Sequence, residues 1–239
     1  MGKKWQAADR AQMPEARQLL FMTQVADSAF PSGGFAFSSG LETLVQEGSI
    51  ESADDYQELV AEQILTRWFE FDRWFLQRAY QSMEARRGVD VVVHADRLCD
   101  VQTLCDPLLQ ASVRMGRAAL TSAHKIGIDS VHDYAEAQRS GRTPGHLPIV
   151  QGVIGASVGM PLLAVEVAAV HALLNGALSA GVRMGRIGAL VAQRTLLELG
   201  DVAAERLQKP CSSLPHAFSP VSEIAATRRD RLDIRLFSA

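Results

Sequence analysis

The chain has 239 residues, of which 47% are hydrophobic and 21% are charged. This composition supports a large buried core and excludes an intrinsically disordered chain, since disordered segments combine low hydrophobicity with high net charge. The formal net charge is −3 and the sequence pI is about 6.1. No basic excess is therefore present to neutralise a phosphate backbone, and we expect no nucleic-acid partner.

The cysteines and the apolar segments bear on the compartment. Cys99, Cys105 and Cys211 are odd in number and form no C-x-x-C pair, so they predict neither a disulfide framework nor a cysteine zinc site and suit a reducing cytoplasm. The N-terminal residues lack the apolar run of a signal peptide. The most apolar tract, 149–178, contains charged and polar residues, Pro161 and several glycines. It predicts buried helices and no membrane span.

The N-terminal region divides into a tail, a helix and a loop. Residues 1–13 are polar and aperiodic and predict a flexible tail. Pro14 stands where a helix can begin, because the first turn does not need its missing N–H group, and this helix is expected to end near Asp27. The segment 28–40 concentrates serine, glycine, proline and phenylalanine, which predicts an aromatic-bearing loop. The turn residues of this loop are Pro31, Gly33, Gly34 and Gly40.

Two helix starts follow the loop. Ser39 and Glu42 have the spacing of a capping box, in which a serine precedes an acidic residue by three positions. Ser52 and Asp55 repeat this spacing. Over 56–75 apolar residues then recur at three- and four-residue steps. This recurrence predicts a long amphipathic helix.

The rest of the chain also has helical patterns. A helix is expected over 98–123, interrupted or kinked at Pro107, and another from Asp129 through Ala137. The segment 141–145 has the glycine and proline content of a loop. Three further prolines are predicted to open helices: Pro148, Pro161 and Pro220. Apart from the brief valine run at 91–93, no segment has strand character. The prediction is an all-α, single-domain bundle of roughly ten helices over residues 14–239.

The sequence contains no familiar catalytic or nucleotide-binding motif. Its six histidines are dispersed, and none has a partner that clearly places two metal ligands on one helical face. We therefore predict a protein that is not an enzyme, with no catalytic residue and no metal site. A basic run near the C-terminus is either a solvated helix face or a docking patch for an acidic partner. It consists of Arg228, Arg229, Arg231 and Arg235.

Three segments carry a more specific signal. Residues 30–42 read FPSGGFAFSSGLE, a proline–glycine–aromatic loop that runs into Ser-x-Gly-Leu-Glu. Residues 146–152 read HLPIVQG, and residues 219–238 form a Ser-Pro-opened segment that closes on Arg-Leu-Phe-Ser. Together, in this order and at these spacings, the segments resemble the UreF family of urease accessory proteins. The likeness extends from about Leu19 to the last residue.

The resemblance implies an all-α, non-catalytic protein of the cytoplasm that forms a homodimer and acts as a nickel-insertion chaperone. It implies a partner of the UreD type, also called UreH, with which such proteins recruit the GTPase UreG to apo-urease. Nickel is then delivered to a lysine-carbamate site of urease. The assembled complex would therefore handle the nickel, and we expect no permanently bound cofactor on this chain.

The resemblance also places the partner-binding residues. Those of the first segment are Phe35, Phe37, Ser38 and Glu42, and those of the last are Arg229, Arg235, Leu236 and Phe237. Aromatic rings supply much of an interface's energy and guanidinium groups orient partners, although core packing is an equal alternative for Phe35. His146 and Arg183 are expected to line an internal polar path for nickel. The alternative for His146 is that it caps the helix that follows it.

Two other functions remain open. The first is a GTPase-activating regulator of UreG, in which Arg235 or Arg183 enters the nucleotide site as an arginine finger. If the protein is an adaptor, changing that arginine would abolish binding. If it is an activator, the same change would leave binding intact and slow GTP turnover. The second is an unrelated helical enzyme, which would need a pocket with convergent titratable groups. The sequence offers no such constellation of titratable residues.

Overall fold

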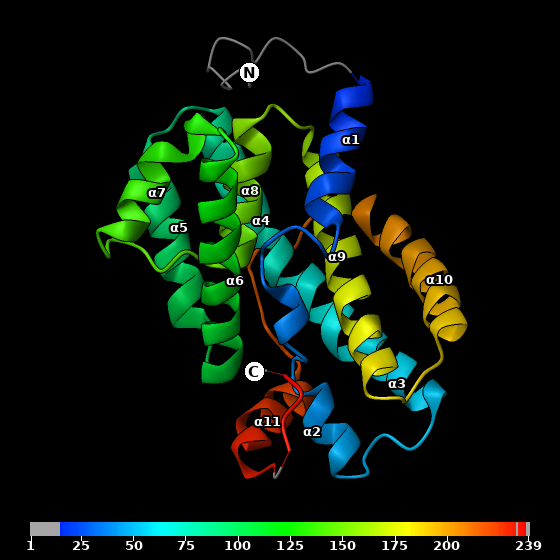
Figure 1. The fold of residues 1–239 in the computed structure, drawn as a ribbon. Helices are drawn as coiled ribbons and strands as arrows, with labels where there is room; N and C mark the ends of the chain where they lie inside the picture. Colours follow the sequence, from blue (N-terminus) through cyan, green and yellow to red (C-terminus); the bar gives the residue numbers. More distant parts are fainter. Residues whose placement is uncertain (1–14, 233, 238–239) are drawn as a thin grey trace.

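Helices and turns form the molecule. The structure is a computed structural model that describes residues 15–232 and 234–237, and no strand occurs among them. The all-α prediction is confirmed. The predicted tail at 1–13 lies outside the described residues. The helices, labelled in Figure 1, are α1 (Glu15–Ala26), α2 (Leu41–Gln46), α3 (Ala53–Leu59), α4 (Arg73–Glu84), α5 (Val89–Gln102), α6 (Asp106–Lys125), α7 (His132–Arg139), α8 (Leu147–Ser157), α9 (Leu162–Arg183), α10 (Ala189–Leu207) and α11 (Pro220–Arg228).

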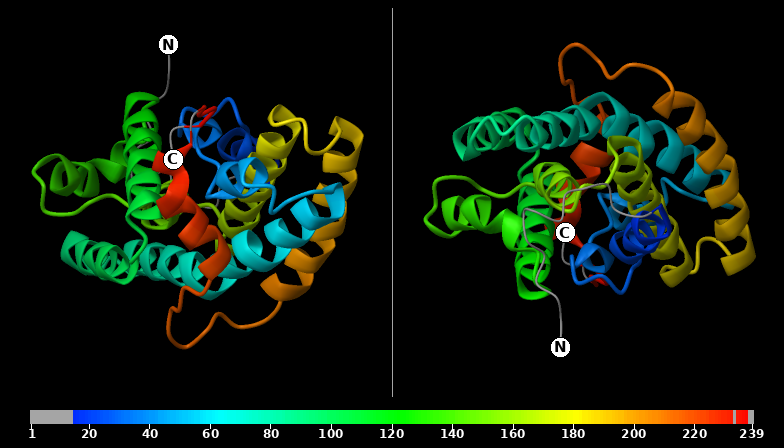
Figure 2. Two further views of the ribbon diagram at one scale, coloured as in Figure 1. Left: turned by 90° about the horizontal axis from the view of Figure 1, so that it is seen from below. Right: turned by 90° about the horizontal axis from the view of Figure 1, so that it is seen from above.

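The central helix is α8, which packs against both α4 and α6. Its contact with α4 is close because residue 152 is a glycine. A Cβ atom at Gly152 would lie 2.4 Å from the backbone oxygen of Leu76. Figure 2 shows α5, α6 and α7 on one side of the molecule and α9 and α10 on the other. Buried side chains from Phe21 in α1 to Ala225 in α11 form one connected hydrophobic cluster.

The long helix predicted over 56–75 is part of a helical stretch over 53–84. Its start is the predicted capping box, in which Ser52 Oγ accepts from the Asp55 N–H group and the Asp55 carboxylate accepts from the Ser52 N–H group. Between α3 and α4 the stretch widens into two π-helical segments, Val60–Leu65 and Trp68–Asp72. Such segments are rare and occur frequently at functional sites.

The prediction of a capping box formed by Ser39 and Glu42 is wrong. Helix α2 begins after Gly40, which has a φ of 85°, and no side chain caps it. Ser39 also has a positive φ, of 52°, so its backbone is not in the extended conformation that an N-cap residue adopts. The carboxylate of Glu42 is instead buried and accepts a hydrogen bond from the backbone of Leu236.

Three further boundaries differ from the expected ones. The break between α5 and α6 falls at 103–105, and Pro107 sits in the first turn of α6, where its missing N–H group costs nothing. Asp129 does not cap a helix but begins a short 3₁₀ turn, Asp129–Val131, that leads into α7. Pro148 and Pro220 lie in first turns as predicted, whereas Pro161 is the residue before α9.

Helix α9 is the one helix of the described residues that is long and apolar enough to cross a membrane. In this structure it packs against α1, α8 and α10. It also carries Glu166, whose side chain is only 4% exposed and pairs with Arg73 of α4. These contacts are those of a core helix.

Arg73 joins three helices through one buried side chain. Its Nε lies 2.8 Å from Glu166 Oε1, and Gln77 donates to the same oxygen at 2.7 Å. The two terminal nitrogens of Arg73 donate to the backbone oxygens of Arg206, Leu207 and Lys209, at the C-terminus of α10. A helix C-terminus carries partial negative charge and unpaired carbonyl groups, so a guanidinium satisfies both there.

We predict that Arg73→Ala lowers the free energy of unfolding by about 3–5 kcal/mol, because it leaves the Glu166 carboxylate buried without its counter-charge. Urea denaturation followed by circular dichroism measures the change. The matched control is Arg139→Ala, which breaks an ion pair with Glu136 whose side chains are both 57% exposed and should cost less than about 1 kcal/mol. Equal losses in the two variants would contradict the role given to Arg73.

Candidate partner-binding site

Segments from the two ends of the sequence meet where α2 packs against α11 (Figure 1). Gly40, the residue before α2, allows this contact. A Cβ atom there would lie 2.4 Å from the backbone oxygen of Ser222 in α11. Gly40 therefore meets two requirements, a positive φ and the close approach of another helix. We call residues 38–40, α2, α11 and residues 234–237 the C-terminal junction.

Helix α2 holds the backbone of the last described residues. Glu42, which is 1% exposed, accepts a hydrogen bond from the N–H group of Leu236. One turn further along α2, Gln46 Nε2 donates to the backbone oxygen of Ile234 at 2.9 Å. An ion pair between Glu47 and Arg228 closes the other side of the junction. Two predicted partner-binding residues, Glu42 and Leu236, thus bind each other within this chain.

Phe237 anchors the end of this segment. Its side chain is 4% exposed, and the Arg183 guanidinium carbon lies 4.3 Å from its ring centroid. Arg229 donates to the backbone oxygen of Phe237. A cation over an aromatic face is attracted by the negative charge of the ring face, while partial burial lowers the pKa of Arg183 from its ordinary value. Arg229 and Phe237 of the last segment therefore form one contact with Arg183 of α9.

The junction also has exposed apolar side chains and buried polar atoms that lack a hydrogen-bond partner among the described residues. The side chain of Leu236 is 61% exposed and that of Ile234 is 70% exposed. Arg235 is exposed and pairs with Asp230 at 3.3 Å. Ser38 is buried, and its Oγ has no hydrogen-bond partner among the described residues; the same holds for Glu42 Oε2. Buried polar atoms of this kind are uncommon and each needs an explanation.

The predicted turn residues lie between α1 and α2. Gly33 has a φ of 74°, and the short 3₁₀ turn Gly34–Ala36 follows it. The backbone oxygen of Pro31 accepts from Ser122 Oγ of α6 at 3.2 Å, which ties the loop to the bundle. The side chain of Phe35 lies outside the described residues, so neither alternative for it is tested. Phe37 is half-buried.

Phe37 lines a cavity of about 220 Å³. The cavity walls come from α1, the loop at 27–39, the π-helical segments, α6, α8 and α9. Trp68 and the ion pair of Arg67 with Asp72, at 2.8 Å, belong to these walls. Burial raises the pKa of Asp72, and the Arg67 charge opposes this rise.

Sequence reasoning missed this cavity because its walls come from segments far apart in the chain. The small residues of α9 were the one signal of it in the sequence, but close packing between helices is the default explanation for small residues. Those that line the cavity are Ala168, Ala169, Ala172, Gly176 and Ala177.

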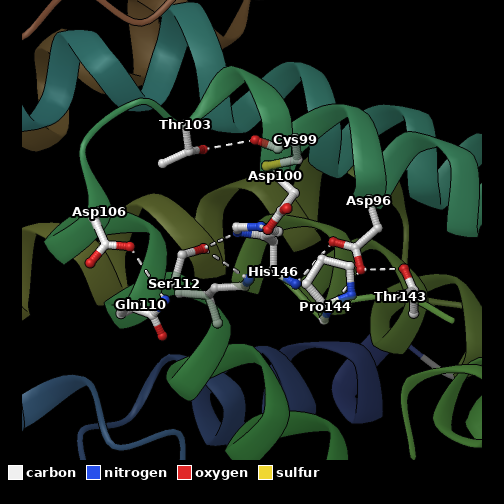
Figure 3. Close-up of polar contacts among 12 residues, drawn as sticks. Asp96, Cys99, Asp100, Thr103, Asp106, Gln110, Ser112, Thr143, Pro144 and His146 are labelled. Atoms are coloured by element: carbon white, nitrogen blue, oxygen red, sulfur yellow. Dashed lines mark hydrogen bonds and ion pairs between the residues drawn. The ribbon is translucent and has the colours of Figure 1, made fainter. Parts of the chain in front are cut away.

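His146 belongs to a buried polar cluster that fixes the start of α8 (Figure 3). Its Nε2 lies 3.0 Å from Asp100 Oδ1 and its Nδ1 lies 3.1 Å from Ser112 Oγ. The same hydroxyl accepts from the Leu147 N–H group at 3.2 Å, so a side chain of α6 caps α8. His146 itself makes no side-chain cap.

Asp96 is the second anchor of this cluster. Its fully buried carboxylate accepts from the hydroxyls of Tyr134 and Thr143 at 2.7 and 2.6 Å. It also accepts from the N–H groups of Gly145 and His146 at 2.7 and 3.0 Å (Figure 3). Burial, and then the Asp96 charge, raise the pKa of Tyr134 well above its usual range. The cluster joins α5, α7 and the loop before α8.

The two residues proposed as a polar path have different neighbours. The ring nitrogens of His146 contact α5 and α6, whereas Arg183 lies over Phe237 at the C-terminal junction. A path between them would have to pass through other groups. Arg67 and Asp72 stand on the cavity wall, as does Ser112 beside His146.

The sequence of this chain matches the UreF family model over residues 50–200. It is 30% identical over 236 residues to the urease accessory protein UreF of Trichodesmium erythraeum (strain IMS101), covering 92% of this chain and 96% of that protein. The chain belongs to the UreF family. The resemblance found in the sequence is thereby confirmed.

Other UreF relatives align over similar lengths. The urease accessory protein UreF of Bacillus sp. (strain TB-90) is 28% identical over 225 residues, which cover 92% of this chain and 98% of that protein. The urease accessory protein UreF of Citrobacter koseri (strain ATCC BAA-895) is 28% identical over 231 residues, which cover 94% and 99%. These relatives are named as accessory proteins and not as enzymes.

A glycine pair tests the C-terminal junction. We predict that Gly40→Ala lowers the free energy of unfolding by about 1–3 kcal/mol more than Gly48→Ala does, because overpacking adds to backbone strain. Both glycines have positive φ, of 85° and 77°, but a Cβ at Gly48 would meet nothing within 4 Å. Chemical denaturation of the two variants measures the difference, and equal effects would contradict the close contact of α2 with α11.

An aspartate pair tests the polar cluster. We predict that Asp96→Asn lowers the free energy of unfolding by about 2–4 kcal/mol, because an amide nitrogen cannot accept the hydrogen bonds that one carboxylate oxygen now accepts. Asp100→Asn is the control, since the Asp100 side chain is 40% exposed and accepts from His146 alone within the cluster. Thermal unfolding followed by calorimetry measures both, and the expected order would be overturned if Asp100→Asn were the more damaging.

Proposed function

We propose that this protein is an adaptor in urease maturation. With a UreD/UreH-type accessory protein it recruits the GTPase UreG to apo-urease, and nickel passes through the assembled complex as cargo. In this proposal the protein works in the cytoplasm as a homodimer, without nucleic acid or membrane as a partner. Its membership of the UreF family supports the role in urease maturation.

The observation that carries the adaptor proposal is the C-terminal junction. Glu42 and Leu236 belong to two predicted partner-binding segments that are far apart in sequence, and they meet in it. The junction exposes a guanidinium at Arg235 beside the apolar side chains of Ile234 and Leu236. Interfaces commonly combine an apolar centre with arginine, because arginine orients a partner through several hydrogen bonds. The junction is therefore the surface that we assign to the UreD/UreH-type partner.

Unpartnered polar atoms at the junction support the same assignment. Ser38 Oγ, Thr43 Oγ1 and Glu42 Oε2 are buried near one end of α2 without a hydrogen-bond partner among the described residues. An unsatisfied buried polar atom costs about 1–3 kcal/mol. A partner that reshaped the segment around Leu236 and supplied donors would recover part of this energy. Binding and a local rearrangement of the junction would then favour each other.

The alternative is that an arginine of this chain stimulates GTP hydrolysis by UreG. Arg183 is engaged with the ring of Phe237 and is partly buried, which leaves it poorly placed to enter another protein's active site. Arg235 is the better candidate for such a finger, since its partner Asp230 has a side chain that is 85% exposed. An exposed ion pair of this kind is weak and exchanges readily.

The first experiment is size-exclusion chromatography with light scattering. The full chain is measured alone, then with a UreD/UreH-type protein, then with GTP-loaded UreG added. We predict a dimer that forms the ternary complex, and we expect Arg235→Ala to weaken assembly by about 30-fold, the effect of losing a hot-spot arginine. Arg139→Ala, an exposed arginine of α7, is the matched control and should leave assembly unchanged.

GTP turnover by UreG in the same mixtures separates the two functions. An adaptor loses the complex together with Arg235, whereas an activator keeps the complex and loses turnover. Failure of the wild-type chain to bind either protein would contradict the adaptor proposal.

A further inference from the structure

Two exposed histidines lie side by side at one end of the molecule. His124 is in the last turn of α6 and His132 is the first residue of α7. Their ring centroids are 5.9 Å apart, and the ring planes are tilted by 40°. The sequence did not indicate this pair, because the turn between the two helices separates the residues and no helical face contains both.

The turn that carries the two rings is held firmly. Ile128 and Val131 lie between the histidines in sequence and are 1% and 0% exposed. The N–H group of Ile128 donates to the backbone oxygen of Ala123 at 3.1 Å, which closes the end of α6. Both imidazoles therefore project from a backbone that buried side chains fix, although the rings themselves face solvent.

The ring separation fits two imidazoles bound to one metal ion. An imidazole nitrogen binds a transition metal at about 2.0–2.1 Å, which puts the ring centroid about 3.2 Å from the metal. Two such rings have centroids about 4.5 Å apart when the ligand angle is about 90° and about 6.4 Å apart when the three atoms are in line. The 5.9 Å observed here falls within this interval. The two rings are therefore at a separation that one bound ion can span.

The surroundings suit a cation that is held weakly. The exposed charged residues of the same segment are Lys125, Asp129 and Asp133, so two acidic groups outnumber one basic group. No group of three or more histidine, cysteine or acidic residues in the described part of the chain is arranged to hold a metal ion. Water, or a group from another protein, would occupy the remaining coordination positions. Sites with open positions exchange ligands, whereas closed four-ligand sites are structural.

We propose that His124 and His132 form a two-ligand site for a divalent transition metal ion on this chain. Imidazole suits nickel, copper and zinc, and in the proposed function the ion is nickel carried as cargo. The existence of the site rests on the geometry of the two rings. Its use for nickel rests on the proposed function.

Isothermal titration calorimetry of the untagged full chain with nickel chloride tests the site. We expect one nickel ion per chain, with affinity at least tenfold lower in His124→Ala and in His132→Ala. His171→Ala, which removes an exposed histidine of α9, is the matched control and should bind as the wild type does. In nuclear magnetic resonance spectra, paramagnetic nickel should broaden the imidazole signals of His124 and His132 before those of the other histidines.

The proposal is overturned if the wild-type chain binds no nickel, or if the affinity is the same in both histidine variants and the control. Both histidines are exposed, so the variants should unfold at the temperature of the wild type, which circular dichroism checks. Chromatography with the UreD/UreH-type protein and UreG distinguishes the two proposals. If His124→Ala loses nickel but assembles normally, both stand; if nickel binds but no complex forms in the wild type, the site stands and the adaptor function fails.

Discussion

The buried pair of Arg73 and Glu166 holds together the helices on which the rest of the structure is built. Arg73 belongs to the long helical stretch over 53–84, Glu166 belongs to α9, and the carbonyl groups that Arg73 binds end α10. Two charges removed from water are costly unless each is paired and hydrogen-bonded. Here the pair is satisfied only when all three helices are in place. The pair therefore fixes how α4, α9 and α10 are arranged relative to one another.

A second buried charge organises the opposite side of the molecule. The carboxylate of Asp96 joins α5, α7 and the start of α8, as Arg73 joins α4, α9 and α10. The cavity lies between these two regions, with α8 and α9 both in its walls. Neither anchor touches the C-terminal junction. A partner can therefore rearrange the junction without disturbing the charges that hold the bundle.

Local patterns in the sequence predicted the helices but not the contacts between them. The all-α fold, the loop at 28–40 and the helix-opening prolines follow from turn chemistry and periodicity, which act within a few residues. The two capping-box spacings show the limit. Ser52 with Asp55 is a true cap, whereas Glu42 at the same spacing from Ser39 is drawn into a contact with Leu236, 194 residues away. A long-range partner overrode a local preference, and nothing near Glu42 in the sequence signals it.

For the candidate sites, too, the sequence predicted individual residues but not the contacts between them. Motif likeness pointed to Glu42, Arg229, Leu236 and Phe237, but gave no reason for them to meet. Their contact required the fold, as did the pairing of Arg183 with Phe237. The cavity and the pair formed by His124 and His132 depend on helices whose order in space no single-sequence pattern specifies. Membership of the UreF family was predictable because short segments resemble that family, whereas the contacts between those segments were not.

The π-helical segments let the helical stretch over 53–84 hold more residues without turning later side chains to another face. Each residue of an α-helix turns the chain by about 100°, and a π segment holds more residues in a turn than an α segment does. Removing one residue from Val60–Leu65, with relaxation to regular α geometry, would therefore leave Arg73 on nearly the same face of the stretch. The same deletion within α3 would rotate Arg73 by about 100° relative to the start of the stretch. A change of length is thus tolerated best where the helix is already widened.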